Sequence, residues 1–178
     1  SSAVAGYKMT LGADAPPACY EDIDHAHTLF IAGSNTAWAH PILFRRIEEA
    51  KARNPAMKII VADPRRTDTA ALADLYLPLQ PGTNVAVLTA MAHVIATEGL
   101  ADEAFIRERC ELDEYADWAA FVSQDRHSPE SLEPVTRVPA ADLRAAARLF
   151  ATGGNGAIYY GLGVTEHSQG SSTVMAIA

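Results

Sequence analysis

The sequence feature that most constrains the fold is an apolar run that ends abruptly in charged residues. The run is Lys58–Ala62 (KIIVA), and Asp63, Pro64, Arg65 and Arg66 follow it directly. It has no alternation of apolar and polar residues, which is typical of a strand buried on both faces of a parallel sheet. Because the chain has a net charge of -8, two adjacent arginines at the end of such a strand indicate an anionic ligand there.

Further apolar runs alternate with helical patterns along the chain, as in β-α-β units. Strands are expected over residues 28–32, 58–62, 75–79 and 157–161, and Pro78 restricts the third to an edge or an end. Helices are expected over residues 41–51, 84–98, 102–109, 113–121 and 138–152 and after residue 172, whereas residues 123–137 are the least regular. Thr83 or Asn84 can cap the second helix, and Gly99 can end it. This order predicts the α/β class, with a doubly wound, mostly parallel sheet and helices on both faces, as in a Rossmann-like dinucleotide-binding domain.

The composition fits one globular domain. The 178 residues, 49% hydrophobic and 20% charged, suffice for one core. The apolar runs are shorter than the roughly 20 residues of a membrane span, and the acidic balance argues against nucleic acid. Cys19 and Cys110 form no metal or redox motif, which fits a reducing compartment. We therefore expect a cytoplasmic protein with no nucleic-acid partner and no membrane span. Both ends of the sequence interrupt a pattern, so we also expect a segment of something longer.

Four loops follow the predicted strands, at the edge where open parallel sheets bind ligands. They are residues 33–36, 63–67, 81–84 and 161–170. Their small and hydroxylic residues let backbone N–H groups approach a phosphate, and arginine pairs with phosphate through a fixed fork of donors. Asp63 can accept a hydrogen bond from a ribose hydroxyl or from the N–H edge of a purine. Two simpler interpretations stay open: Asp63 and the arginines as a solvated ion pair, and Gly33 as a tight turn only.

The sequence contains no self-contained catalytic constellation. No G-x-G-x-x-G motif follows the first predicted strand, which disfavours an ordinary NAD-binding domain, and no G-x-S-x-G motif marks a nucleophile. Among the histidines, His167 is the best functional candidate because it lies in a glycine-bounded loop at a strand end, whereas His93 is expected to be packed. Glu166 and Asp63 as an acid pair stay open, although nothing in their spacing favours this role.

The same loops carry a family resemblance. The segments GSNTAWAHPILFRRIEEAK, IVADPRRTDTAALADLYLPLQPGTNVAVL and GLGVTEHSQGSSTVMAIA resemble the molybdopterin oxidoreductases, which bind molybdenum or tungsten through two molybdopterin guanine dinucleotides. The likeness covers essentially the whole chain, with several motifs in the family's order and spacing. Residues 1–78 most resemble assimilatory nitrate reductases, and residues from 79 onward are closer to the formate dehydrogenase alpha subunit.

The resemblance implies that residues of all four loops bind the cofactor. The residues that it places there are Gly33, Ser34, Asn35, Thr36, Asp63, Pro64, Arg65, Arg66, Thr67, Gly82, Thr83, Asn84, Gly163 and Glu166. The first loop would meet the phosphate and pterin side, and the second would take the guanosine end. Glu166 and His167, the candidate catalytic residue, would lie near the pterin and the metal. Glu166 departs from the glutamine often found there in nitrate reductases, which counts against a nitrate substrate.

The resemblance also implies parts that lie outside the sequence. The metal ligand, a cysteine or selenocysteine, would fall just before Ser1, so no metal ligand is expected within residues 1–178. The implied cofactor is Mo-bis(molybdopterin guanine dinucleotide), with a [4Fe-4S] cluster in an upstream domain. The implied partners are the remaining domains of the same subunit, an electron-transfer subunit and a small anionic substrate. Residues 1–178 would then be a single cofactor-binding domain, a fragment of a larger catalytic subunit.

Two substrates follow from the two halves of the resemblance. Nitrate, reduced to nitrite, is favoured because the helix that begins at Ser1 should lie closest to the metal. Formate, oxidised to carbon dioxide, is the alternative. A catalytically inert nucleotide-binding or interaction domain is a second alternative, and the fragment alone is expected to be inactive.

Overall fold

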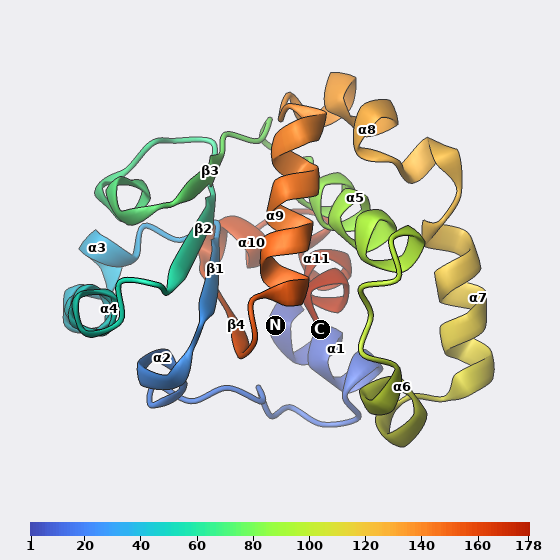
Figure 1. Cartoon of the computed structure of the whole chain (residues 1–178), viewed down its shortest axis with the longest axis horizontal. Coiled ribbons are helices and arrows are strands. Elements are labelled where there is room, and N and C mark those ends of the chain that lie inside the picture. Colours follow the sequence, from blue (N-terminus) through green and yellow to red (C-terminus); the bar gives the residue numbers. More distant parts are fainter.

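The fold is built on a four-stranded parallel sheet with the strand order β3-β2-β1-β4 (Figure 1). A computed structural model describes residues 1–178. The strands are β1 (Thr28–Ala32), β2 (Lys58–Ala62), β3 (Leu75–Leu77) and β4 (Gly156–Tyr160). Every neighbouring pair runs parallel. The predicted doubly wound α/β class is therefore confirmed.

Helices cover both faces of this sheet, as Figure 1 shows. On one side lie α2 (Asp22–His25), α3 (Thr36–Ala39), α4 (Pro41–Arg53) and the 3-10 turn η1 (Asp68–Leu72). On the other side lie α1 (Ser2–Thr10), α5 (Asn84–Thr97), α9 (Ala140–Thr152), α10 (Leu162–Thr165) and α11 (Gly170–Ile177). The outer elements on that side are α6 (Glu103–Arg109), α7 (Leu112–Val122), the 3-10 turn η2 (Asp125–His127) and α8 (Pro129–Thr136). None of these helices combines the length and the apolar character needed to cross a membrane.

Two separate apolar layers explain why the strands lack alternation. Side chains at alternate strand positions point to opposite faces. Phe30 and Ile60 belong to the layer under α5 and α9, whereas Leu29 and Ile59 belong to the layer under α4. Both faces of β1 and β2 are therefore buried, which confirms the prediction made for β2.

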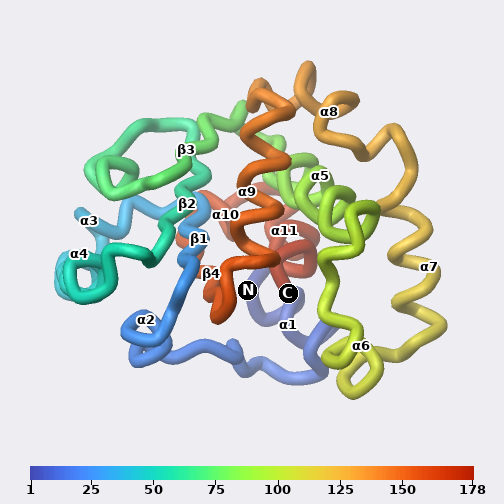
Figure 2. The backbone as a smooth tube through the Cα atoms, in the orientation of Figure 1, coloured from blue at the N-terminus to red at the C-terminus, as the bar shows by residue number.

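The two ends of the chain lie side by side in α1 and α11 (Figure 2). Gly6 makes this possible, because a Cβ atom there would lie 2.5 Å from Val174 Cγ1. The hydroxyl of Tyr7 in α1 also accepts a hydrogen bond from the hydroxyl of Tyr160, the last residue of β4. The first helix is thus fixed to the sheet and to the last helix.

Two sequence predictions about regular structure need correction. The third strand ends at Leu77 and not at residue 79, since Pro78 has no N–H with which to continue the ladder; β3 is an edge strand, as expected. Residues 123–137 are not irregular, because they contain η2 and α8. Ser128 caps α8 by accepting from Ser131 N, and Pro129 occupies its first turn, where a missing N–H costs nothing.

The start of α5 also differs from the prediction. Thr83 occupies the N-cap position, but neither its side chain nor that of Asn84 caps the helix. The Thr83 hydroxyl instead donates to Gln80 O at 2.7 Å. The first N–H groups of α5 therefore have no side-chain acceptor, which leaves them available to a ligand. Gly99, with a φ of +66°, follows the helix end as predicted.

An ion-pair network joins α5, α8 and α9 on the surface. Arg144 donates to both carboxylate oxygens of Glu130, at 2.8 and 2.7 Å, and also contacts Glu98 at 3.0 Å. Arg148 donates to the same Glu98 carboxylate at 2.7 Å. The hydrogen bonds from Arg144 lower the pKa of Glu130 from 4.5 to about 2.

The shifted pKa of Glu130 predicts a pH-dependent contribution to stability. A carboxylate whose pKa falls on folding stabilises the fold above its unfolded pKa of 4.5 and loses this effect as the pH falls toward about 2. Because the Glu130 side chain is 57% exposed, solvent screening limits the effect to below about 1 kcal/mol. Urea unfolding should show Glu130→Gln less stable than wild type at pH 7, with the difference shrinking between pH 4.5 and pH 2. A difference that stays constant over this range would contradict the assignment.

Candidate functional site

A cavity of about 220 Å³ lies at the carboxyl edge of the sheet. It is lined by Gly33, Asn35, Asp63, Pro64, Arg65, Leu79, Pro81, Gly82, Asn84, Gly163 and His167. These residues come from the segments that follow all four strands. Open α/β sheets bind ligands at this edge, where loop amides and helix N-termini converge. The structure therefore brings together the four loops that the sequence singles out.

Two of the residues that line the cavity, Gly33 and Gly163, are in close contact. Gly33 leaves β1 with a φ of +54°, and its carbonyl oxygen accepts from Gly163 N at 3.0 Å. A Cβ atom on Gly33 would lie 2.7 Å from the carbonyl carbon of Gly163. Gly33 is thus more than a tight turn, because its missing side chain lets the loops after β1 and β4 touch.

Asp63 shapes the loop after β2. It is only 7% exposed, and its Oδ1 accepts from the backbone N–H of Arg65 at 2.8 Å. The Tyr76 hydroxyl donates to the Asp63 carbonyl at 2.9 Å. Burial, followed by the nearby Asp63 charge, raises the pKa of Tyr76, so this hydroxyl stays protonated as a donor. The solvated ion pair between Asp63 and the arginines is not formed.

The two arginines have different surroundings. Arg65 lines the cavity, whereas Arg66 lies over the Tyr76 ring, with its guanidinium carbon 5.3 Å from the ring centroid. The ten ion pairs of the structure include neither arginine. Arg65 is therefore the uncompensated cation of the cavity, and Arg66 packs beside it.

The third loop contributes an amide and an open glycine. Asn84 Nδ2 donates to Gly163 O at 3.3 Å, which ties the start of α5 to the loop after β4. Gly82 has a φ of +87°, and a Cβ atom there would have no neighbour within 4 Å. A side chain at position 82 would therefore point into open space.

Several expected residues lie beside the cavity and do not line it. They are Ser34, Thr36, Arg66, Thr67, Thr83 and Glu166. The hydroxyls of Ser34 and Thr36 bond each other at 2.9 Å, and Glu166 is exposed at the end of α10. Thr67 Oγ1 is buried without any hydrogen-bond partner, an unusual state for a buried hydroxyl. His167 lines the cavity, and its ring has no hydrogen-bond partner within the chain.

Sequence reasoning missed Leu79 and the residues that support the cavity. Leu79 lines the cavity, but it was expected to be the last residue of the third strand. A prediction that ended this strand at Leu77 would have placed Leu79 in the loop that lines the cavity. Tyr76 and Thr69 support Asp63 and Asn35 by hydrogen bonds. Such contacts depend on tertiary structure and leave no local pattern in the sequence.

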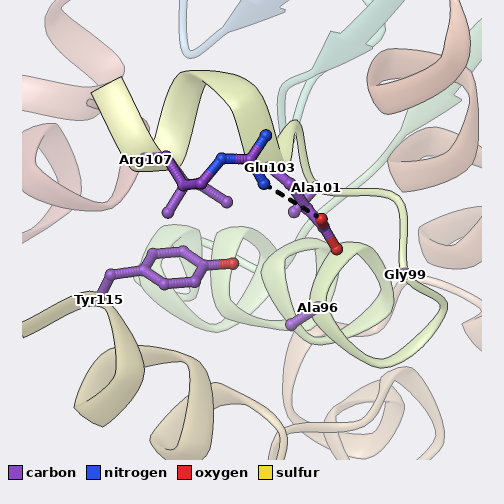
Figure 3. A pocket seen from close by; sticks show the side chains of 7 residues that line it. Ala96, Gly99, Ala101, Glu103, Arg107 and Tyr115 are labelled. Carbon is purple, nitrogen blue, oxygen red and sulfur yellow. Dashed lines mark ion pairs between the residues drawn. The ribbon is translucent and has the colours of Figure 1, made fainter. Parts of the chain in front are cut away.

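A larger cavity, of about 330 Å³, lies elsewhere (Figure 3). It is bounded by Ala96 and Gly99 at the far end of α5, about 20 Å along that helix from Asn84, and by Arg107 and Tyr115. Its two charged side chains, Glu103 and Arg107, pair with each other at 3.7 Å. It therefore offers no free charge to a ligand, and the smaller cavity is the better candidate.

The residues around the smaller cavity fit part of a nucleotide. Arg65 and the uncapped start of α5 offer donors for phosphate oxygens. The buried Asp63 carboxylate retains acceptor capacity for a hydroxyl or a base N–H. A volume of about 220 Å³ is below the roughly 300–1,000 Å³ of sites that enclose a whole ligand, so this cavity would hold only one end of a dinucleotide.

The fold and the position of the cavity are those of the doubly wound α/β domains that bind ligands at the carboxyl edge of the sheet. The description of the matching family model is Molybdopterin oxidoreductase, and the match covers residues 4–178. The chain therefore belongs to the molybdopterin oxidoreductase family.

Known relatives of the chain are named either nitrate reductase or formate dehydrogenase. The chain is 45% identical over 154 residues to a nitrate reductase of Symbiobacterium thermophilum, covering 83% of this chain and 20% of the relative. It is 41% identical over 175 residues to formate dehydrogenase H of Escherichia coli, covering 98% of this chain and 24% of the relative. The chain thus spans about a fifth to a quarter of the length of these relatives.

A solved structure resembles the whole fold. Acetylene hydratase from Pelobacter acetylenicus superposes with a TM-score of 0.80 at 27% identity, covering 98% of this chain and 23% of that chain. Its name denotes a reaction different from those of the two relatives above. Proteins named for different reactions therefore contain a region similar to this chain.

Proposed function

We propose that residues 1–178 hold the guanosine diphosphate end of a molybdopterin guanine dinucleotide within a larger molybdenum oxidoreductase subunit. The observation that carries the proposal is an unpaired Arg65 beside the buried Asp63 carboxylate, in a cavity at the carboxyl edge of the sheet. In a chain of net charge -8, an arginine kept free of carboxylates at this edge suits an anion. Molybdopterin guanine dinucleotide has phosphates that the Arg65 guanidinium can bind and a base that can donate to the Asp63 carboxylate.

Each loop has a distinct task in this proposal. Arg65 and the first N–H groups of α5 bind phosphate oxygens, and Asp63 accepts from the guanine N–H edge or from a ribose hydroxyl. Asn35 donates to the same ligand, and the carbonyl-bound Asn84 keeps the loop of Gly163 against the cavity. Six residues expected to bind the cofactor lie beside the cavity, and their contacts with the ligand stay predictions: Ser34, Thr36, Arg66, Thr67, Thr83 and Glu166. A side chain at Gly82 would point into open space, so this position leaves room for the ligand.

The remaining parts of the enzyme lie outside this chain. When bound, the cofactor supplies the metal at which electrons are exchanged with the substrate. The protein's part is to bind and orient the dinucleotide. His167 lines the same cavity as Arg65 and Asp63, so in this proposal it would lie beside the bound nucleotide, and its expected catalytic role stays a prediction. The metal ligand, a [4Fe-4S] cluster and an electron-transfer subunit belong to the rest of the protein in this proposal, together with a second dinucleotide.

We propose nitrate as the substrate. Its reduction to nitrite consumes two electrons and two protons and releases water, and the electron-transfer subunit supplies the electrons. The 45% identity to a relative named nitrate reductase supports this choice. Formate is the second candidate, supported by the 41% identity to formate dehydrogenase H over nearly the whole chain. A cytoplasmic location stays a prediction, and one relative, from Desulfovibrio desulfuricans, is named a periplasmic nitrate reductase.

The full-length subunit, purified with its cofactor, tests the proposal. Acid release should yield two guanine nucleotides per molybdenum, and the enzyme should reduce nitrate with a reduced viologen dye. Formate oxidation without nitrate reduction would replace the substrate but keep the cofactor assignment. A subunit that contains neither molybdenum nor guanine would favour the inert nucleotide-binding or interaction domain.

A further inference from the structure

Thr69 is a fully buried threonine that joins two loops of the cavity. It lies in η1, shortly after the Arg65 loop, and is 0% exposed. Its hydroxyl oxygen accepts from Ala37 N at 3.0 Å, and its proton is donated to Asn35 Oδ1 at 3.2 Å. Asn35 lines the cavity, whereas Thr69 does not. Thr69 therefore contacts the cavity through Asn35.

The hydrogen bonds of Thr69 determine how the Asn35 amide is oriented. A hydroxyl has one proton, and Ala37 N–H already occupies an acceptor position of Thr69 Oγ1. If the Asn35 amide were flipped, its NH2 group could donate to the second lone pair of Thr69 Oγ1, but the buried hydroxyl proton would lose its acceptor, which costs about 1–3 kcal/mol. Asn35 Oδ1 is therefore held against Thr69, and its NH2 group remains for the cavity.

A second contact holds the same two segments together. Trp38 Nε1 donates to Asp68 Oδ2 at 2.7 Å, one residue along each segment from the Thr69 contacts. Trp38 is 74% exposed, so this bond lies at the surface and the Thr69 bonds lie beneath it. The segment that contains Asn35 is thus held by buried hydrogen bonds from Thr69 and by an exposed hydrogen bond between Trp38 and Asp68.

We propose that Thr69 is a positioning residue, which directs the two N–H donors of Asn35 at the phosphate oxygens of the bound nucleotide. This inference rests on the proposed function, because it assumes that an anionic nucleotide occupies the cavity. An inward-facing amide oxygen would repel such a ligand, whereas the NH2 group adds to the donors of Arg65 and the start of α5. Thr69 itself does not touch the ligand.

The test is calorimetric titration of the cofactor-free full-length subunit with GDP. Asn35→Ala should weaken GDP binding tenfold or more, and Thr69→Val, which keeps the shape and removes the hydroxyl, should weaken it about tenfold. The double variant should bind no worse than Asn35→Ala alone, because Thr69 acts through Asn35. Thr69→Ser retains the hydroxyl and should restore binding to within about twofold of wild type.

Three results would overturn the inference. Unchanged GDP binding by Thr69→Val would remove the role, and so would a double variant whose loss is the product of the two single losses. Asn35→Asp provides a test that leaves the buried Thr69 untouched: the carboxylate has no N–H donors, so it should bind GDP at least tenfold more weakly, and unchanged binding would show that the oxygen side faces the cavity. Wild type that binds no GDP at all would instead overturn the proposed function, and the inference with it.

Discussion

Gly33→Ala is expected to destabilise the chain by about 2–5 kcal/mol. A left-handed backbone costs a non-glycine residue about 1–2 kcal/mol, and a forced contact in a packed region costs about 1–3 kcal/mol. Both apply, since Gly33 has a φ of +54° and a new Cβ atom would lie 2.7 Å from the carbonyl carbon of Gly163. For a chain of this size, the melting temperature should fall by roughly 4–20 °C. Calorimetric or circular dichroism melting measures the change.

Gly82→Ala is the matched control for this prediction. Gly82 also has a positive φ, of +87°, but a Cβ atom there would meet nothing within 4 Å. It should therefore lose only the backbone cost of about 1–2 kcal/mol. Equal losses in the two variants would mean that the loops after β1 and β4 do not depend on the Gly33–Gly163 contact.

Arg65→Ala is expected to cause the largest loss of cofactor. Removing one charge-assisted phosphate contact costs about 1.5–3 kcal/mol, which corresponds to roughly a tenfold to hundredfold increase in the dissociation constant. The purified full-length variant should therefore retain much less molybdenum and guanine than wild type. Metal analysis and nucleotide chromatography of the same preparation measure both.

Arg66→Ala is the neighbouring control, because the structure separates the two arginines. Arg66 lies over the Tyr76 ring and does not line the cavity. Its loss should change cofactor content by less than about fivefold, in keeping with an exposed cation–π contact of about 0.5–1 kcal/mol. If Arg66→Ala loses as much cofactor as Arg65→Ala, the division of roles between them is wrong.

The burial and the position of a strand could be predicted from the sequence where a local pattern of residues reflects the surroundings of the whole strand. The unbroken apolar run of β2 predicted burial on both faces, and Pro78 predicted an edge position for β3; both are confirmed. Two prolines led to a wrong prediction. Because of Pro129 and Pro134, residues 123–137 were expected to be irregular, but Pro129 lies in the first turn of α8, where proline is compatible with a helix.

The candidate site was predictable as a set of loops but not as a set of contacts. The carboxyl ends of parallel strands share an edge, so Asn35, Asp63 and Gly163 could be placed together from strand order alone. Which of two adjacent arginines lines the cavity depends on the Tyr76 ring of another strand. The role of Thr69 depends on a hydrogen bond across 34 positions of sequence, which no local pattern encodes.

A structure of the full-length subunit with its cofactor bound would show whether these loops hold one anionic ligand. The guanidinium nitrogens of Arg65 should then lie about 2.7–2.9 Å from phosphate oxygens of a guanine dinucleotide, and the base or ribose of the same ligand should lie within hydrogen-bond distance of Asp63. A dinucleotide bound elsewhere, with Asn35, Arg65 and Gly82 all facing solvent, would contradict the assignment.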